Sequence, residues 1–248
     1  MTNYENFNAF FHTVMALNGF SRFSDESYAK PFFDLTERML TVNESMNLTA
    51  IKEASEIILL HYADSLTAEP FLPQNARVAD IGCGAGFPCL PLAICRPDLS
   101  ILALDSTEKR IKYVKETAEL LGCKGLNAIP MRAEEGGRGV YRDSFDVCTA
   151  RAVAALPLLS ELCLPYVRVG GAFLAMKGKR GEEELKASTS AIRKLGGEVA
   201  RVHSITLHRP IPRDGTEEET RCLIEIKKIK PTPVEYPRAW AKILKRPL

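Results

Sequence analysis

The 248-residue chain lacks the sequence features of a membrane-bound or secreted protein. It has no apolar run near the roughly 18–20 residues that a membrane-spanning helix requires. Its first residues, MTNYENFNAFFHTV, lack the basic start and the apolar block of a signal peptide. None of its seven cysteines forms a C-x-x-C pair or lies near histidines at the spacing of a zinc site. These absences predict a cytoplasmic protein with reduced cysteines, no metal site and no membrane partner.

The chain has little net charge overall, but an excess of basic residues is concentrated at the C-terminal end. The net charge of the chain is +2, whereas Lys227 to Leu248 contain seven basic residues and one acid. This segment therefore carries +6, and residues 1–226 carry −4. A basic tail favours a polyanionic partner nearby. A solvated tail that only improves solubility explains the charge equally well, so composition leaves both interpretations open.

Hydrophobic periodicity changes along the chain and predicts three parts. Apolar residues recur at helical spacing in three early stretches, residues 3–18, 24–45 and 53–68. From Arg77 onward, short β-rich runs such as RVADIG and SILALD alternate with helical runs such as PCLPLAICR and TEKRIKYVKETAELLG. The predicted parts are an N-terminal helical extension over 1–70, a main domain over 71–230 and the basic tail over 231–248.

The alternation of strands and helices predicts the fold class of the main domain. It indicates an α/β fold with a mostly parallel sheet that helices cover on both faces. The last two β-rich runs, EVARVHSITLH and TRCLIEIKKI, have a loop but no helix between them, so they can pair antiparallel. We therefore expect five or six parallel strands and one reversed last strand.

A glycine-rich turn, DIGCGAGF, follows the first expected strand. In open α/β sheets, ligands bind beyond the carboxyl ends of the strands, so this turn is a candidate binding loop. A phosphate loop would need a lysine after the glycines. Gly82, Gly84 and Gly86 form G-x-G-x-G, not the G-x-G-x-x-G of dinucleotide-binding loops, and the bulky Phe87 follows them. Asp80 precedes the glycines and favours a cationic ligand over a phosphate.

S-adenosylmethionine fits such a loop, because it carries a sulfonium, an ammonium and an adenosine but no phosphate. Asp105 ends the second expected strand, where its carboxylate can accept both ribose hydroxyls. NAD-binding domains share this acid, so Asp105 alone does not discriminate between the two cofactors. Glu134 follows the third expected strand and can hold the adenine amino group, although an acid at a helix start has the same appearance.

The order of the remaining motifs resembles one family of enzymes. NLTAI, H-x-x-DSL, DIGCGAGFPCLPLAI, LDSTEKRIKYV, RAEE, FDVCTARAVAALPLLSELCLP, GGAFLAMKG and YPR follow one another from about residue 40 to the C-terminus. They are similar to the RsmG (GidB) family of bacterial small-subunit rRNA methyltransferases. The resemblance implies a Rossmann-like class I methyltransferase that uses S-adenosyl-L-methionine. It also implies methylation of N7 of a guanine in a 16S rRNA loop. We expect the partner to be 16S rRNA or the 30S ribosomal particle, and the enzyme to be a monomer.

The resemblance also implies the residues of the site. Family positions carry over onto Gly82, Phe87, Ala133, Glu134 and Arg151. Together with the loop and strand residues above, the expected cofactor site is Asp80, Gly82, Gly84, Gly86, Phe87, Asp105, Ala133, Glu134 and Arg151. Arg151 is also the expected catalytic residue, because its guanidinium can pair with the methionine carboxylate or with guanine O6. Guanine N7 already has a free lone pair, so the reaction needs no general base.

Several residues are candidates for contact with the RNA, namely Asn47, His61, Lys177, Lys179 and Arg180. Helix capping by Asn47 and ordinary packing of His61 explain those two residues as well. The ending AWAKILKRPL differs from the Gly-, Pro- and Asn-rich ending of some relatives, which leaves the role of the tail open. Three other functions stay open: a methyltransferase of the same fold with a small-molecule or protein substrate, an NAD-dependent oxidoreductase, and a catalytically silent RNA-binding module.

Overall fold

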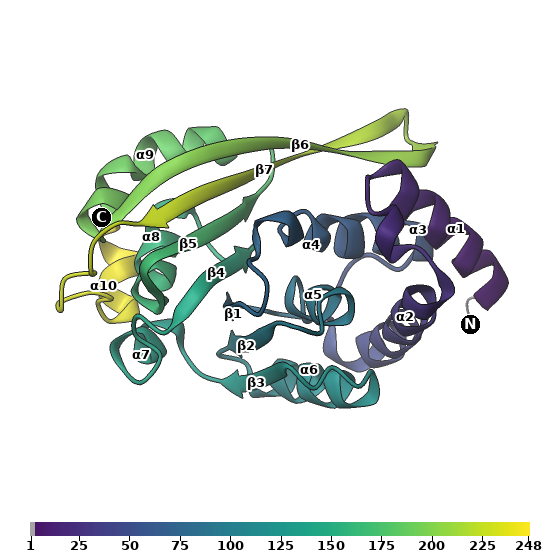
Figure 1. Cartoon of the computed structure of the whole chain (residues 1–248), viewed down its shortest axis with the longest axis horizontal. Helices are drawn as coiled ribbons and strands as arrows, with labels where there is room; N and C mark the ends of the chain where they lie inside the picture. The colour runs from purple at the N-terminus through teal and green to yellow at the C-terminus, as the bar shows by residue number, and fades with distance from the viewer. Residues whose placement is uncertain (1–2) are drawn as a thin grey trace.

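The computed structural model describes residues 3–248 and contains one seven-stranded sheet flanked by helices (Figure 1). The strands are β1 (Arg77–Ile81), β2 (Ser100–Asp105), β3 (Leu126–Pro130), β4 (Phe145–Arg151), β5 (Val167–Lys177), β6 (Gly197–Arg213) and β7 (Thr216–Lys228). Their order in the sheet is β3-β2-β1-β4-β5-β7-β6. Six strands of the described residues run parallel, and β7 is antiparallel to both β5 and β6. The expected mostly parallel sheet with a reversed last strand is confirmed.

The β6–β7 hairpin is longer than the sequence pattern predicted. We expected strands over 198–208 and 220–229, with a loop between them, but the two strands continue to a two-residue turn. Asp214 and Gly215 form this turn with φ values of 50° and 73°. Positive φ at both central residues matches the right-handed twist of the strands, and Asp-Gly is a preferred pair for such turns. The far half of the hairpin therefore projects beyond the sheet toward the N-terminal helices (Figure 1).

The three helical stretches expected before residue 70 are confirmed. They are α1 (Tyr4–Leu17), α2 (Glu26–Met46) and a longer helix made of α3 (Ala54–Ile57), the π-helical η2 (Ile58–Ala63) and α4 (Asp64–Leu66). The short 3-10 turns η1 (Ser21–Phe23) and η3 (Glu69–Phe71) adjoin them. π-helical turns are rare and occur often at functional sites, so the position of η2 marks this helix as notable.

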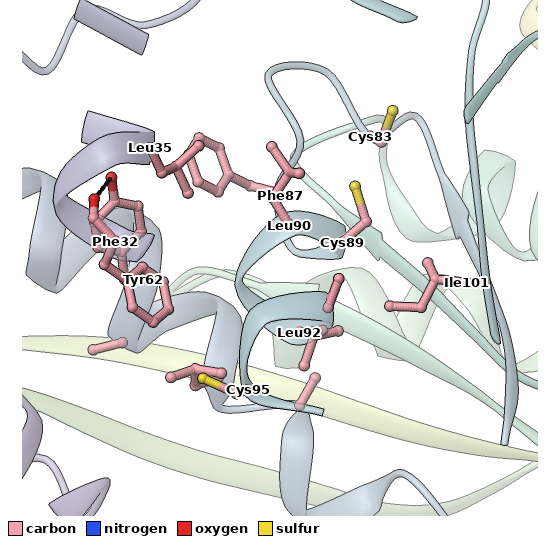
Figure 2. Close-up of a cluster of buried hydrophobic side chains, with 14 of the residues drawn as sticks. Phe32, Leu35, Tyr62, Cys83, Phe87, Cys89, Leu90, Leu92, Cys95 and Ile101 are labelled. Carbon is pink, nitrogen blue, oxygen red and sulfur yellow. Dashed lines mark hydrogen bonds between the residues drawn. The ribbon is translucent and has the colours of Figure 1, made fainter. Parts of the chain in front are cut away.

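The N-terminal helices share one hydrophobic core with the main domain. Phe32 and Leu35 of α2, together with Tyr62 of η2, pack toward Phe87 and Leu90 at the start of α5 (Cys89–Cys95) (Figure 2). The hydroxyl groups of Tyr62 and Thr36 form a buried hydrogen bond of 2.7 Å. The N-terminal segment therefore helps to position the glycine loop by packing against Phe87 and Leu90, which follow it.

Successive side chains of each strand point to opposite faces of the sheet, and the helices on each face form a separate hydrophobic core. Val78 belongs to the core beneath α5 and α6 (Glu108–Leu120), whereas Ala79 belongs to the core of the opposite face. Helices α7 (Ala133–Arg138), α8 (Leu156–Cys163), α9 (Gly181–Lys194) and α10 (Trp240–Lys245), with the 3-10 turn η4 (Leu164–Tyr166), contribute to that opposite side. No helix within residues 3–248 is long and apolar enough to cross a membrane.

The basic C-terminal segment packs against the domain. The sequence predicted a separate tail over 231–248, but Tyr236 and Ile243 are buried in the core that contains α8. Lys228, just before it, is also buried, and its ammonium donates to the backbone oxygen of Leu164 at 2.5 Å. Arg238 forms an ion pair with the buried Glu161. Lys227 contacts Glu225 at 3.1 Å. Three of the seven basic residues counted at this end are thus engaged in internal contacts.

Candidate active site

The loop after β1 contains the glycine-rich motif predicted from the sequence. Its backbone conformation favours glycine. Gly82, Gly84 and Gly86 have φ values of 72°, 56° and 91°, in the region that side chains disfavour. A Cβ on Gly82 would lie 2.5 Å from Cγ2 of Val153, and one on Gly86 would lie 2.3 Å from Cδ1 of Leu90. A Cβ on Gly84 would come no closer than 3.9 Å to another residue. Two of these glycines are therefore required by packing as well as by conformation.

A first cavity of about 290 Å³ lies beyond the carboxyl ends of β1, β2 and β3. Its walls include several of the residues predicted to bind the cofactor, namely Gly82, Asp105, Ala133 and Glu134. The other lining residues are Ile81, Leu104, Ser106, Thr107, Arg110, Met131, Arg132, Ala152, Val153, Leu162 and Trp240. The predicted position at the switch point of the sheet therefore coincides with a hollow that contains two acids.

Asp105 holds the loops around this cavity together. Its Oδ2 accepts the Gly84 N–H at 3.1 Å, and its Oδ1 accepts the Thr107 N–H at 2.8 Å. A carboxylate has about four lone-pair sites, so two hydrogen bonds leave acceptor capacity for hydroxyl groups in the cavity. Arg110 lies 3.8 Å away and adds positive charge beside the carboxylate.

Glu134 provides a second acid on the wall formed by α7. Its side chain is largely buried and lines the cavity from the first turn of the helix. The backbone beside it is fixed, because the Tyr166 hydroxyl donates to the Ala133 oxygen at 2.7 Å. The wall is tightly packed, since a Cβ on Gly136 would lie 2.3 Å from the same hydroxyl. This arrangement fits an acceptor for an amino group.

Asp80 lies beneath the glycine loop, away from the cavity. It is 1% exposed, accepts the Cys89 N–H at 3.2 Å and accepts the Thr149 hydroxyl at 3.1 Å. Burial raises the pKa of Asp80 to about 6. The structure thus gives Asp80 a contact with the start of α5, not a position in the cavity wall where it could contact a cationic ligand. Gly84, Gly86 and Phe87 are also absent from the cavity walls as residues 3–248 form them.

A second cavity of about 650 Å³ adjoins the first one. The two share Ala152 and Val153, which follow β4 directly. Ala152 has a φ of 57°, which is unusual for a residue with a side chain and is found often at functional sites. The second cavity is lined by Ile51, Leu60, His61, Asp64, Arg151, Ala152, Val153, Ala154, Ala155, Met176, Lys177, Gly178, Arg180, Glu184 and Arg221.

Arg151 ends β4 in the wall of the second cavity. It is held in place by residues of η2 and α4. Its Nη1 donates to Asp64 Oδ2 at 3.0 Å and to the Leu60 oxygen at 3.1 Å. Its guanidinium carbon lies 5.2 Å from the centre of the Phe87 ring. Burial lowers the pKa of Arg151 from its usual value, an effect that the charge of Asp64 opposes.

Asp64 joins Arg151 to a second arginine that the sequence analysis missed. The other carboxylate oxygen, Oδ1, accepts from Nε of Arg221 at 3.1 Å. The H-x-x-D motif drew attention to Asp64, but Arg221 lies on β7 with no motif around it. Because both oxygens are engaged by arginines, Asp64 orients cations at the cavity wall.

His61 also belongs to the second cavity, where it is a poor proton acceptor. Its ring stacks on Phe87 with centroids 4.5 Å apart, and its Nε2 lies 2.9 Å from the Thr49 hydroxyl. Burial, with the nearby charge of Arg151, lowers the pKa of His61 to about 3. Its Nδ1 has no hydrogen-bond partner among the described residues. The imidazole is therefore neutral near pH 7.

The other predicted RNA-contacting residues divide into engaged and exposed groups. Lys177 is engaged, since its ammonium contacts Glu184 at 2.8 Å and the Ala154 oxygen at 2.5 Å. Lys179 and Arg180 are exposed, and Arg180 lines the second cavity. Asn47 is exposed at the end of α2 with a φ of 49°, which fits a helix cap.

The chain is similar to one family over most of its length. Residues 29–211 match the family described as rRNA small subunit methyltransferase G, GidB. The ribosomal RNA small subunit methyltransferase G of Lactobacillus delbrueckii is 42% identical over 228 residues, which cover 90% of this chain and 91% of the relative. That of Acetivibrio thermocellus is 41% identical over 237 residues and covers 95% of each chain.

Solved structures with little sequence identity share the fold. A SAM-dependent O-methyltransferase from Thermotoga maritima has a TM-score of 0.53 and 16% identity, covering 77% of this chain and 71% of that one. A precorrin-6y C5,15-methyltransferase from Geobacter metallireducens has a TM-score of 0.52 and 13% identity, covering 74% and 91%. The fold is therefore that of the class I S-adenosylmethionine-dependent methyltransferases, as the sequence predicted.

Proposed function

The chain belongs to the rRNA small subunit methyltransferase G (GidB) family. We propose that it methylates N7 of a guanine in bacterial 16S rRNA, and that its two adjoining cavities bind the methyl donor and the guanine. The methyl donor is S-adenosyl-L-methionine, which supplies an electrophilic methyl group on a sulfonium. The family assignment applies to the chain as a whole, since this chain and its relatives cover about nine-tenths of each other.

The observation that carries this proposal is the wall shared by the two cavities. The first cavity has Gly82 of the glycine loop and the acids Asp105 and Glu134, which suit a nucleoside with hydroxyl and amino groups. The second has the His61 ring and the cations Arg151, Arg180 and Arg221 in its walls, which suit a base. Ala152 and Val153 separate the two, so a donor in one and a base in the other would meet at these residues.

The second cavity supports a reaction without a general base. His61 is neutral and weakly basic, and both oxygens of Asp64 accept hydrogen bonds from arginines. Guanine N7 attacks with a lone pair that needs no deprotonation, so the task of these residues is orientation. Holding two reactants in line can lower a barrier by roughly 7–11 kcal/mol.

We assign the orienting role to Arg151. A guanidinium has five N–H donors, and within residues 3–248 only those of Nη1 are engaged, by Asp64 and Leu60. The remaining donors are available for guanine O6, beside N7, or for the methionine carboxylate. Asp64 then acts as a positioning residue, because it fixes the guanidinium from the opposite side.

The exposed cations Lys179 and Arg180 at the rim are proposed to contact RNA phosphates. Asn47 and His61 stay as further candidates for contact with the RNA. We also propose that the enzyme acts as a monomer in the cytoplasm, where its ribosomal substrate is found.

Transfer of a tritiated methyl group from S-adenosylmethionine tests the proposal. The substrates are 30S particles, protein-free 16S rRNA and 23S rRNA. We expect incorporation into 16S rRNA, in one or both of its forms, and none into 23S rRNA. Arg168→Ala is a matched control for Arg151→Ala, because Arg168 also pairs with an aspartate, Asp146, but near the amino ends of β4 and β5. No incorporation into 16S rRNA, or equal incorporation into 23S rRNA, would refute the proposal.

A further inference from the structure

The C-terminal segment contributes a wall to the first cavity. Trp240, the single tryptophan of the chain, is the first residue of α10 and lines this cavity with Met131, Ala133 and Leu162. Figure 1 shows α10 beside α7 and α8, far along the chain from the glycine loop. Trp240 is partly buried, so its ring is neither free in solvent nor enclosed in the core.

Contacts on both sides of Trp240 hold it at this position. Two residues before it, the backbone and side chain of Arg238 donate three hydrogen bonds of 2.6–2.8 Å to Glu161, which is fully buried. Arg138 donates to the Pro237 oxygen at 2.6 Å. Three residues after Trp240, Ile243 is 0% exposed. The backbone is therefore fixed on both sides of Trp240, and this holds the indole in the wall of the cavity.

The neighbours of Trp240 indicate which part of the cofactor it would contact. The methyl group must lie toward Ala152 and Val153, because these residues border the second cavity. Trp240 contributes to the same cavity as Met131, Ala133 and Glu134, which follow β3 and form its α7 side. An aromatic face combined with an acid is suited to a purine, because the ring packs on the base and the acid accepts from its amino group.

We propose that Trp240 is a cofactor-binding residue that packs against the adenine of S-adenosylmethionine, with the segment around it acting as a fixed wall of the adenosine site. This inference rests on the proposed function for the identity of the ligand. It gives the C-terminal segment a role in cofactor affinity that its charge did not indicate. Packing of a base against an aromatic ring changes affinity by about 5- to 150-fold when the ring is removed.

Because Trp240 is the single tryptophan, its fluorescence reports directly on the cavity. S-adenosylhomocysteine, the stable product, is titrated into the full-length protein while fluorescence and calorimetry are recorded. We expect a saturable fluorescence change with the same dissociation constant as calorimetry. Trp240→Ala should weaken binding about 5- to 150-fold, and Trp240→Phe should recover most of the loss. Leu244→Ala, on the same helix and 59% exposed, is the matched control and should bind normally.

Two results would overturn the inference, and they are distinguishable. Normal binding by calorimetry, without a fluorescence change and with unchanged affinity in Trp240→Ala, would remove Trp240 from the site and leave the proposed function intact. No calorimetric binding by the wild-type protein would refute the cofactor assignment itself, and the role of Trp240 with it. Circular dichroism of each variant, compared with Trp240→Phe, separates lost binding from lost folding.

Discussion

Replacement of Asp105 by alanine is expected to weaken binding of S-adenosylmethionine strongly. The carboxylate lines the first cavity, and two of its lone-pair sites are engaged by the Gly84 and Thr107 N–H groups. The remaining sites are proposed to accept the ribose hydroxyls. Hydrogen bonds to a charged group contribute about 1.5–3 kcal/mol, so the dissociation constant should rise about 10- to 150-fold.

The same substitution also removes an acceptor from two backbone donors, so its effect on stability must be measured separately. Isothermal titration calorimetry gives the dissociation constant, and thermal unfolding gives the stability of each variant. Asp146→Ala is the matched control, because Asp146 also accepts a backbone N–H, from Arg77 at 2.7 Å, but lies at the amino end of the sheet. It should lower the melting temperature and leave the affinity unchanged. A folded Asp105→Ala protein with wild-type affinity would refute the assignment of Asp105.

Three further outcomes are expected. Gly84→Ala should cost about 1–2 kcal/mol of stability through its φ alone, whereas Gly86→Ala should cost more, because its Cβ would clash with Leu90; equal denaturant midpoints would contradict this. Arg151→Ala should slow single-turnover methyl transfer about 100-fold, whereas His61→Ala should slow it only modestly, and the wild-type rate should show no titration between about pH 6 and 9; a pH step that disappears in His61→Ala would overturn this assignment. The pKa of His61 is lowered from 6.5 to about 3 in the folded protein, so below pH 6.5 the unfolded chain binds a proton that the folded protein does not. The free energy of unfolding should therefore fall as the pH drops from 6.5 toward about 3. Urea unfolding at pH 7 and pH 5 should show a smaller loss of stability at pH 5 in His61→Gln than in the wild type.

Local patterns were sufficient to predict the sheet and the glycine loop. Alternating β-rich and helical runs predict parallel strands because short connections allow few topologies. Gly82 directly follows β1 and Asp105 ends β2, so both must lie at the carboxyl ends of the strands, where the first cavity is found. The Asp-Gly turn at 214–215 was also present in the sequence, but the two prolines before it hid the continuation of β6.

Features that depend on contacts between distant segments could not be predicted in this way. The direction of the Asp80 side chain is set by Thr149 and by the start of α5, which the local sequence does not reveal. Arg221 reaches Asp64 from a strand 157 residues away. In the C-terminal segment, charge alone left a polyanion-binding tail and a solvated tail equally open, whereas buried partners such as Glu161 hold Arg238 against the domain.

Identification of the methylated atom tests the central claim most directly. 16S rRNA that has reacted with the enzyme and S-adenosylmethionine is treated with borohydride and then aniline, which cleaves RNA at N7-methylguanine. We expect one new cleavage site at a guanine in a loop, present with the wild-type enzyme and strongly reduced with Arg151→Ala. Incorporated methyl groups without cleavage, or with the label on an exocyclic amine, would contradict a reaction that proceeds by orientation and without a base.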